Sequence, residues 1–240
     1  MNTQAQLLQA IAARESGDYD EALRLNLSMH EAPPPDEPGE RNILLFSLYE
    51  WALLAQEYPA ARTALLALRS RELAQLASDT QRRFQLIAEI NRHLGDASAT
   101  VALFRQLETK LPDAASRAFH GIADVLLDEG AVDVLQRHLP EPHEGMHYRA
   151  QYLDAMAGER LPRRLGEAQS FVGMLQLQCG VLTLLGKTSE AAALMEAALG
   201  QIKTEEARAL VRRELEQPGA IAALMQDWHR NQGAPSDFRQ

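Results

Sequence analysis

Apolar residues recur along this chain at the three- and four-residue spacing of amphipathic helices, and glycines interrupt them at intervals. The positions that make up the first such unit are Ala10, Ala13, Gly17, Tyr19, Ala22 and Met29. Glycine permits a tight turn, small residues let two helix axes approach, and larger residues fill the space between them. The pattern therefore predicts two antiparallel helices joined by a turn at Gly17.

The same pattern returns at four later points, with predicted turns at Gln56, Gly95, Gly130 and Gly186. The interval before Gly186 is the longest, and we expect it to hold one extra helix at about residues 146–157. A single hairpin cannot bury both of its apolar faces, so each hairpin has to stack on the next. The residues at inter-helix positions that we expect to be mostly buried are Tyr19, Ala61, Phe104 and Cys179.

Signals for β-structure are missing from the sequence. Val and Ile are few and scattered, and no alternating run of β-branched residues is bounded by turn residues. Leu and Ala, which favour helices, dominate the apolar content. The sequence therefore predicts an all-α fold, in which residues 205–232 form helices that cap the array.

The repeated unit resembles the tetratricopeptide-repeat (TPR) family, whose repeat of about 34 residues combines a turn glycine, small residues and a closing proline. The resemblance implies a TPR-like α-solenoid, a right-handed superhelix of antiparallel helix pairs. Regular repeats would cover residues 1–139, and an irregular continuation with C-terminal capping helices would cover 140–240 in one continuous domain. Leu7 and Ile11 replace the Lys and Asn with which the chaperone-binding subclass clamps a peptide carboxylate.

In this family the first helix of each hairpin lines a concave groove. The resemblance therefore implies a non-catalytic scaffold or adaptor that binds a protein or peptide in that groove. The polar residues that it places in the groove or on its rim are Arg14, Glu50, Arg82, Gln85, Glu89, Arg92, His93, His120 and Asp124. A self-assembling structural subunit, joined through apolar faces near residues 43–54, is an alternative.

Charge and composition limit the classes of partner that we expect this protein to bind. The formal net charge of −9 repels phosphate backbones, so we expect no nucleic-acid partner. No apolar run approaches the roughly 20 residues of a membrane helix, and no basic and apolar secretory leader follows Met1. With a single cysteine, Cys179, no internal disulfide can form. We expect a cytoplasmic protein that has no membrane partner and no cofactor.

The second alternative is a zinc-dependent hydrolase. The segment from His143 to His147 reads HEGMH and fits the H-E-x-x-H pattern, in which two histidines hold zinc while the Glu, here Glu144, acts as general base. Glu167 could supply a third ligand. Pro142 favours a helix start instead, which would place Glu144 in the first turn for electrostatic reasons. On that interpretation at least one of the two histidines points to solvent.

Three further motifs have ordinary structural explanations. Residues 180–188 read GVLTLLGKT and approach the phosphate-binding P-loop, but five residues rather than four separate the glycines. We interpret them as a helix end and turn. Cys179 is interpreted as a packing thiol rather than a nucleophile. Arg160, Arg163 and Arg164 form a predicted basic loop that could hold an anion.

Overall fold

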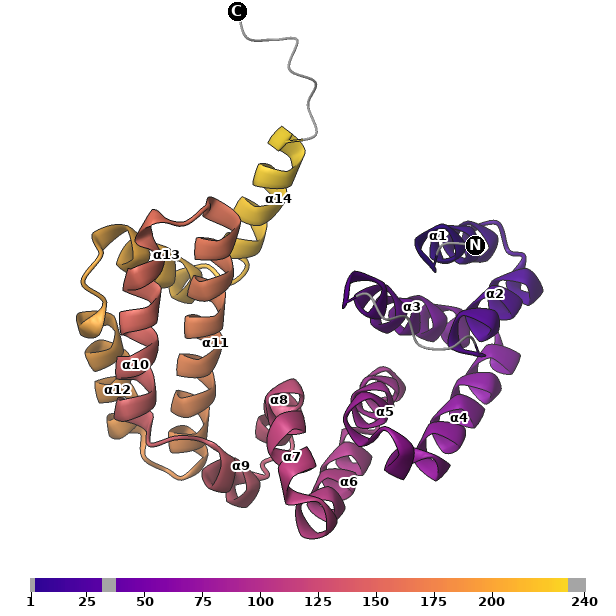
Figure 1. Ribbon diagram of the computed structural model, residues 1–240, viewed down its shortest axis with the longest axis horizontal. Helices are drawn as coiled ribbons and strands as arrows, with labels where there is room; N and C mark the ends of the chain where they lie inside the picture. The colour runs from indigo at the N-terminus through magenta and orange to yellow at the C-terminus, as the bar shows by residue number, and fades with distance from the viewer. Residues whose placement is uncertain (1–2, 32–37, 233–240) are drawn as a thin grey trace, which may run out of the picture. The chain divides into compact units, whose positions relative to one another are not determined.

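The computed structural model describes residues 3–31 and 38–232 of the chain (Figure 1). Throughout these residues the regular structure is helical and no strand occurs, which confirms the all-α prediction. The sequence predicts an extended connector at Pro33, Pro34, Pro35 and Pro38. The first three prolines and residues 233–240 lie outside the described ranges, whereas Pro38 is the first residue of α3. The chain divides into two compact units, unit 1 (Met1–Val125) and unit 2 (Leu126–Gln240), and each is considered by itself.

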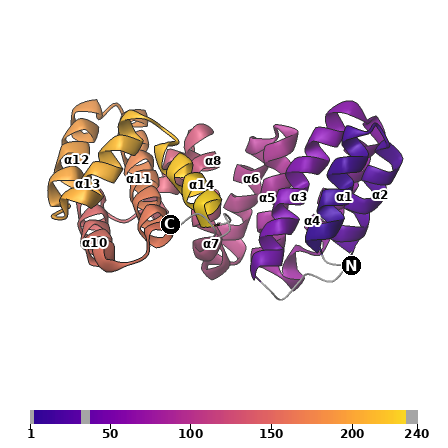
Figure 2. The ribbon, with the colours of Figure 1, turned by 90° about the horizontal axis from the view of Figure 1, so that it is seen from above.

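Unit 1 is built from consecutive helical hairpins. Its elements are α1 (Thr3–Glu15), α2 (Tyr19–Glu31), α3 (Pro38–Glu57), α4 (Pro59–Ala74), η1 (Leu76–Ser78), α5 (Thr80–Leu94), α6 (Ala97–Lys110), α7 (Pro112–Ala118) and η2 (Phe119–Gly121). Each α-helix packs on the next one, and α3 also packs on α1 and α5. Helices α1, α3 and α5 therefore form one layer, while α2, α4 and α6 form a second (Figures 1 and 2).

The turns follow the sequence pattern at the glycines but not at Gln56. Gly17 and Gly95 have φ angles of 81° and 71°, in the left-handed region that other residues rarely adopt. Gln56 lies inside α3, so its assignment as a turn residue was wrong. The turn falls at Tyr58 because Pro59, at the first position of α4, ends the preceding helix and starts the next.

The core of unit 1 lies between its two layers. Trp51 of α3 is fully buried, and its indole N–H donates to the Ala61 carbonyl of α4 across 3.0 Å. Leucines from both layers surround it. Ala61 and Phe104 are fully buried, as predicted. Tyr19 is only partly buried, because its hydroxyl reaches the surface to donate to Glu57 across 2.8 Å.

Unit 2 is organised around one long helix. Its elements after α8 (Ala123–Asp128), which contains the boundary, are α9 (Val132–His138), α10 (Pro142–Ala155), η3 (Met156–Gly158), α11 (Leu161–Leu184), α12 (Thr188–Gln201), α13 (Glu205–Glu216) and α14 (Ala220–Gln232). Helix α11 contacts α9, α10, α12, α13 and α14. The extra helix predicted at 146–157 is α10, and the predicted capping segment consists of α13 and α14.

Side-chain carboxylates fix the starts of the last two helices. Asp154 of α10 accepts hydrogen bonds from the backbone N–H groups of Lys203 and Thr204, immediately before α13. Buried Glu214 does the same for Gly219 and Ile221 before and within α14. These bonds satisfy N–H groups that a helix start leaves without a partner in its own backbone.

Two predictions in unit 2 were wrong. Arg163 and Arg164 do not lie in a basic loop but in the first turn of α11, where Pro162 favours a helix start. They pair with Glu159, across 3.3 Å, and with Glu206 respectively. Cys179 is half-buried rather than mostly buried, although its sulfur lies against α12, 3.5 Å from the Ala191 carbonyl oxygen.

Candidate protein-binding surface

Two aromatic side chains of α3 are exposed beside α5. Phe46 and Tyr49 are 52% and 46% exposed, respectively, and their ring centroids lie 5.9 Å apart. Residues three apart share one face of a helix, so both rings project from the same side of α3. The ring of His93, on α5, lies 5.8 Å from that of Tyr49. Large exposed aromatic residues of this kind are enriched where proteins bind one another.

A charged cluster continues this face on α5 and α8. Arg92 lies 3.0 Å from Asp124 and 3.6 Å from Glu89, and the His93 Nε2 lies 3.1 Å from a Glu89 oxygen. The hydrogen bond from His93 and the charge of Arg92 lower the pKa of Glu89, so this carboxylate stays ionised. We call the six residues Phe46, Tyr49, Glu89, Arg92, His93 and Asp124 the α3–α5 surface.

Arg14 and Glu50 form a separate pair that joins helices. Their side chains lie 3.4 Å apart, Arg14 also reaches Glu57 across 3.5 Å, and Glu50 is only 9% exposed. A charged pair with so little exposure offers few atoms to a partner. This pair therefore holds α1 against α3 and contributes less to a binding surface than the exposed charges do.

Arg82 belongs to a third cluster, at the start of α5. It pairs with Asp79 across 2.9 Å and lies 3.9 Å from Glu72, a buried carboxylate that Arg71 and Arg83 also contact. Two opposite charges with little solvent around them stabilise each other more than exposed ones do. These ion pairs therefore connect α4 to α5.

The two remaining predicted groove residues are exposed. Gln85 projects from α5 towards Gly121, and His120 lies on η2 with its ring 5.5 Å from that of Phe119. The structure thus brings together Glu89, Arg92, His93 and Asp124, whereas Arg14, Glu50 and Arg82 pair with other residues. The groove prediction did not include Phe46 and Tyr49, although both lie in the apolar segment 43–54 that the self-assembly alternative used. Their signal was the run from Ile43 to Leu54, which holds more apolar residues than one helix face can bury.

The HEGMH segment forms the start of α10. Pro142 is its first residue, Glu144 lies in its first turn, and the N–H of Glu144 donates to the Glu141 side chain across 2.8 Å. His143 and His147 are both exposed, which confirms the predicted geometry. Within the described ranges, no three His, Cys, Asp or Glu side chains gather closely enough to hold a metal ion, and Glu167 completes no such group.

The geometry leads to a prediction about zinc. Protein purified without added metal is expected to contain well below one zinc ion per chain by elemental analysis. The reason is that two exposed histidines on one helix lack the further ligands that a zinc site requires. Stoichiometric zinc that disappears in a His147→Ala variant, together with a hydrolytic activity, would instead establish the hydrolase alternative.

The other two motifs carry no reactive arrangement. Residues 180–188 form the end of α11, a turn at Gly186 with φ of 75°, and the first residue of α12. Burial raises the pKa of the Cys179 thiol, and its sulfur lies 3.5 Å from the Ala191 carbonyl oxygen. A raised pKa reduces the thiolate fraction, so Cys179 is a poor nucleophile.

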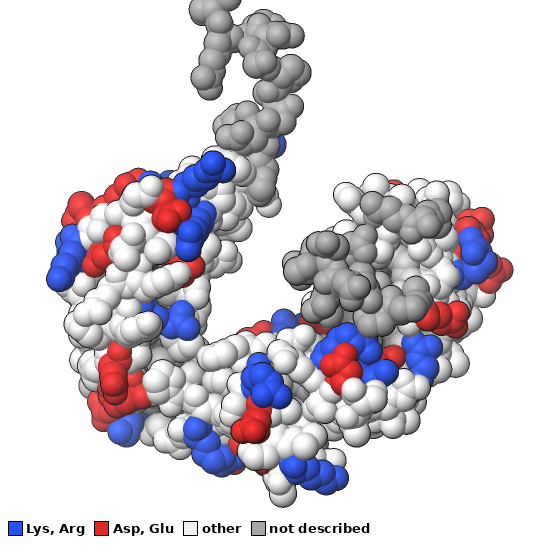
Figure 3. Space-filling view, in the orientation of Figure 1, with Lys and Arg blue, Asp and Glu red and all other residues white. Residues whose placement is uncertain are grey.

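On the face visible in Figure 3, acidic and basic side chains alternate in small groups, and neither sign forms a broad patch. Among the described residues, no helix is both long and apolar enough to cross a membrane.

Comparisons of the chain with models of known protein families, with curated proteins and with solved structures found no match.

Proposed function

We propose that this protein is a non-catalytic binding module of the TPR-like kind, which holds a protein or peptide partner on the α3–α5 surface. The single observation that carries the proposal is the exposure of Phe46 and Tyr49 beside the ion pairs of α5. Burying such rings in a complex stabilises it, and the charged rim selects and orients the partner. The small, interspersed charges in Figure 3 fit a protein partner better than a nucleic acid.

The layered packing of unit 1 supports the same proposal. Helices α1, α3 and α5 lie side by side, so that residues from successive hairpins form one continuous face (Figure 1). Stacked hairpins of this kind offer extended surfaces to partners. We propose the TPR-like superhelix and a cytoplasmic location as parts of the same interpretation.

Partner capture tests the proposal directly. The full-length protein is immobilised and exposed to an extract of its native cells, and retained proteins are identified by mass spectrometry. A Phe46→Ala, Tyr49→Ala double variant is expected to retain the partner at least about tenfold less, because exposed aromatics of an interface often carry its binding energy.

Tyr148→Ala is the matched control, since Tyr148 is 72% exposed but lies on α10, in unit 2. Retention that drops in the double variant but not in this control would support the proposal. Equal retention by all three proteins would overturn it. The solution mass of each protein tests the alternative partner, a second copy of this chain, since self-association through residues 43–54 would be lost in the double variant.

A further inference from the structure

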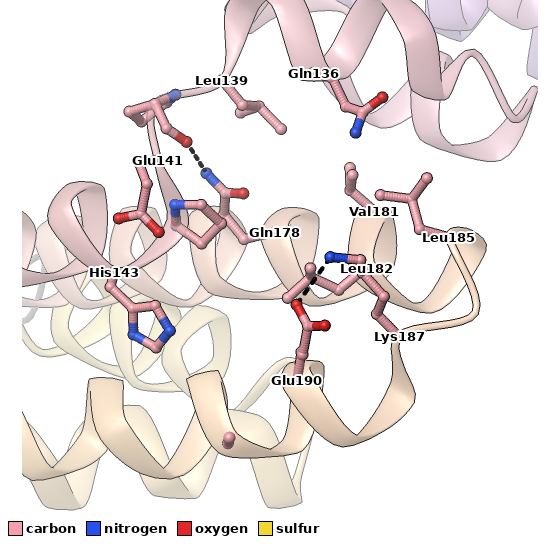
Figure 4. Close-up of a pocket in the computed structure, with 13 residues that line it drawn as sticks. Gln136, Leu139, Glu141, His143, Gln178, Val181, Leu182, Leu185, Lys187 and Glu190 are labelled. Atoms are coloured by element: carbon pink, nitrogen blue, oxygen red, sulfur yellow. Dashed lines mark hydrogen bonds and ion pairs between the residues drawn. The ribbon is translucent and has the colours of Figure 1, made fainter.

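Unit 2 contains a groove of about 480 Å³ between the connection from α9 to α10 and the hairpin of α11 and α12 (Figure 4). Two pairs of its polar groups are engaged with each other. The Gln178 amide donates to the Pro140 carbonyl oxygen across 3.1 Å, and the Lys187 nitrogen lies 3.1 Å from a Glu190 oxygen. None of the residues that line the groove is a Phe, Tyr or Trp. The groove therefore favours no particular ligand.

The α3–α5 surface, in contrast, combines aromatic rings with carboxylates, and both kinds of group attract a positive charge. The rings of Phe46, Tyr49 and His93 follow one another at centroid distances of 5.9 and 5.8 Å. Glu89 continues this row, because one of its oxygens lies 3.1 Å from the His93 Nε2. A carboxylate thus adjoins the aromatic rings.

The charges within the α3–α5 surface do not cancel. Arg92 lies 3.0 Å from Asp124 and 3.6 Å from Glu89, so one guanidinium is shared between two carboxylates. With His93 counted as neutral, one negative charge of this surface is left uncompensated. The hydrogen bond from His93 and the charge of Arg92 lower the pKa of Glu89, which keeps its carboxylate ionised at neutral pH. The surface therefore offers a negative charge to an arriving cation.

The carboxylates and the rings are all accessible from solvent. The side chain of Asp124 is 58% exposed and that of Glu89 is 29% exposed, while Phe46 and Tyr49 are about half exposed. The formal net charge of the whole chain, −9, also attracts basic partners over longer distances. An acidic segment would be repelled both by the chain and by this surface.

Among basic side chains, arginine matches this surface best. Its planar guanidinium stacks on aromatic rings, and its N–H groups donate in pairs to a carboxylate. Covering the rings of Phe46 and Tyr49 also requires an apolar neighbour, because a charged side chain alone would leave part of their apolar area in water.

From these observations we propose that the partner presents a basic segment to the α3–α5 surface. An arginine of the segment stacks on Tyr49 and pairs with the carboxylates of Glu89 and Asp124, while a neighbouring apolar side chain covers Phe46. This inference rests on the proposed function, because it names the kind of partner that the same surface binds. The occupant follows from charge complementarity, since the added cation gives each carboxylate a positive partner.

Nuclear magnetic resonance with capped dipeptides tests the inference on the full-length protein. N-acetyl-leucyl-arginine methylamide is expected to shift the backbone amide signals of Tyr49, Glu89 and His93, with a Kd on the order of 1 mM for so small a probe. The citrulline analogue replaces the guanidinium by a neutral urea group of the same shape, and it is expected to bind at least about threefold more weakly. The glutamate analogue is expected to cause no shifts at these residues.

Two exposed carboxylates at opposite ends of α5 provide matched variants. Asp124 lies beside Arg92, in the last turn of α5, whereas Asp113 lies with Thr80 and Gln81 at the start of that helix. Asp124→Asn is expected to weaken binding of the arginine dipeptide at least about threefold, and Asp113→Asn is expected to leave it unchanged. Both side chains are at the surface, so neither substitution disturbs the core.

Three outcomes would overturn the inference. The first is the absence of shifts at the α3–α5 surface at about 20 mM arginine dipeptide, well above the expected Kd. The second is equally tight binding of the citrulline or glutamate analogue. The third is binding that Asp124→Asn leaves undiminished or that Asp113→Asn weakens equally.

The failure of this inference and that of the proposed function are distinguishable. Partner capture that depends on Phe46 and Tyr49, together with dipeptides that show no preference for arginine, would overturn this inference alone. Equal capture by the original protein and its variants would overturn the proposed function itself.

Discussion

Replacing Phe104 by alanine is expected to lower the free energy of unfolding of unit 1 by about 3 to 5 kcal/mol. Phe104 is fully buried on α6, and its ring lies 5.9 Å from that of Phe84 and 6.4 Å from that of Phe119. Truncation would leave a cavity between three helical elements and remove both aromatic contacts. Chemical denaturation followed by circular dichroism measures the change.

Leu8→Ala serves as the comparison for Phe104→Ala, because Leu8 is 60% exposed on α1. Its loss is expected to change the free energy of unfolding by less than about 0.5 kcal/mol. If Phe104→Ala costs less than about 1 kcal/mol, the packing assigned to Phe104 in the repeat is incorrect.

Acidification below pH 6.5 is expected to destabilise unit 1 through His30. The ring of His30 lies 5.6 Å from that of buried Trp51, and its Nε2 is 2.8 Å from the Ser47 hydroxyl. Desolvation, and then the positive charge of Arg71, lower the pKa of His30 from its ordinary value of 6.5 to about 4. Part of the residue reaches the surface, but the surroundings of the ring favour its neutral form.

The direction of the effect follows from proton binding. In the unfolded chain His30 takes up a proton near pH 6.5, whereas in the folded chain it does so only near pH 4. The contribution of neutral His30 to the free energy of unfolding is therefore complete above pH 6.5. It is lost as the pH falls towards 4, by about 3 kcal/mol in total.

Denaturant titrations between pH 7.5 and 4.5 measure this loss, and His30→Gln is the control that removes the titrating ring. The free energy of unfolding of the variant should depend less on pH than that of the original protein. Identical pH dependence in the two proteins would show that His30 is accessible to protons in the folded state.

The positions of the hairpins could be predicted because the signals for them are local. Gly17, Gly95, Gly130 and Gly186 all adopt positive φ, a conformation that depends mainly on the absence of a side chain at that residue. The start of α10 at Pro142 is similarly encoded by proline geometry. The prediction of a turn at Gln56 was wrong because the second turn uses Tyr58 and Pro59 in place of a glycine. The glycine that marks the other turns is therefore missing from this part of the sequence.

The candidate surface could be predicted only in part. Helical spacing correctly indicated that polar residues of α5 lie off its packing face, and Glu89, Arg92 and His93 do form one cluster with Asp124. The burial of Glu50 beside Arg14 could not be read from α3 alone, because it depends on where α1 packs. Spacing within one helix does not specify the neighbours that cover it.

The helical class, the glycine turns and the proline helix starts follow from the sequence, because they depend on the backbone preferences of neighbouring residues. Which side chains are covered and which remain exposed depends instead on how the helices pack. This packing left Phe46 and Tyr49 uncovered, and it placed Pro140 within reach of Gln178, far along the chain. Such contacts join residues distant in sequence, so they arise from the packing of whole helices and not from any local pattern.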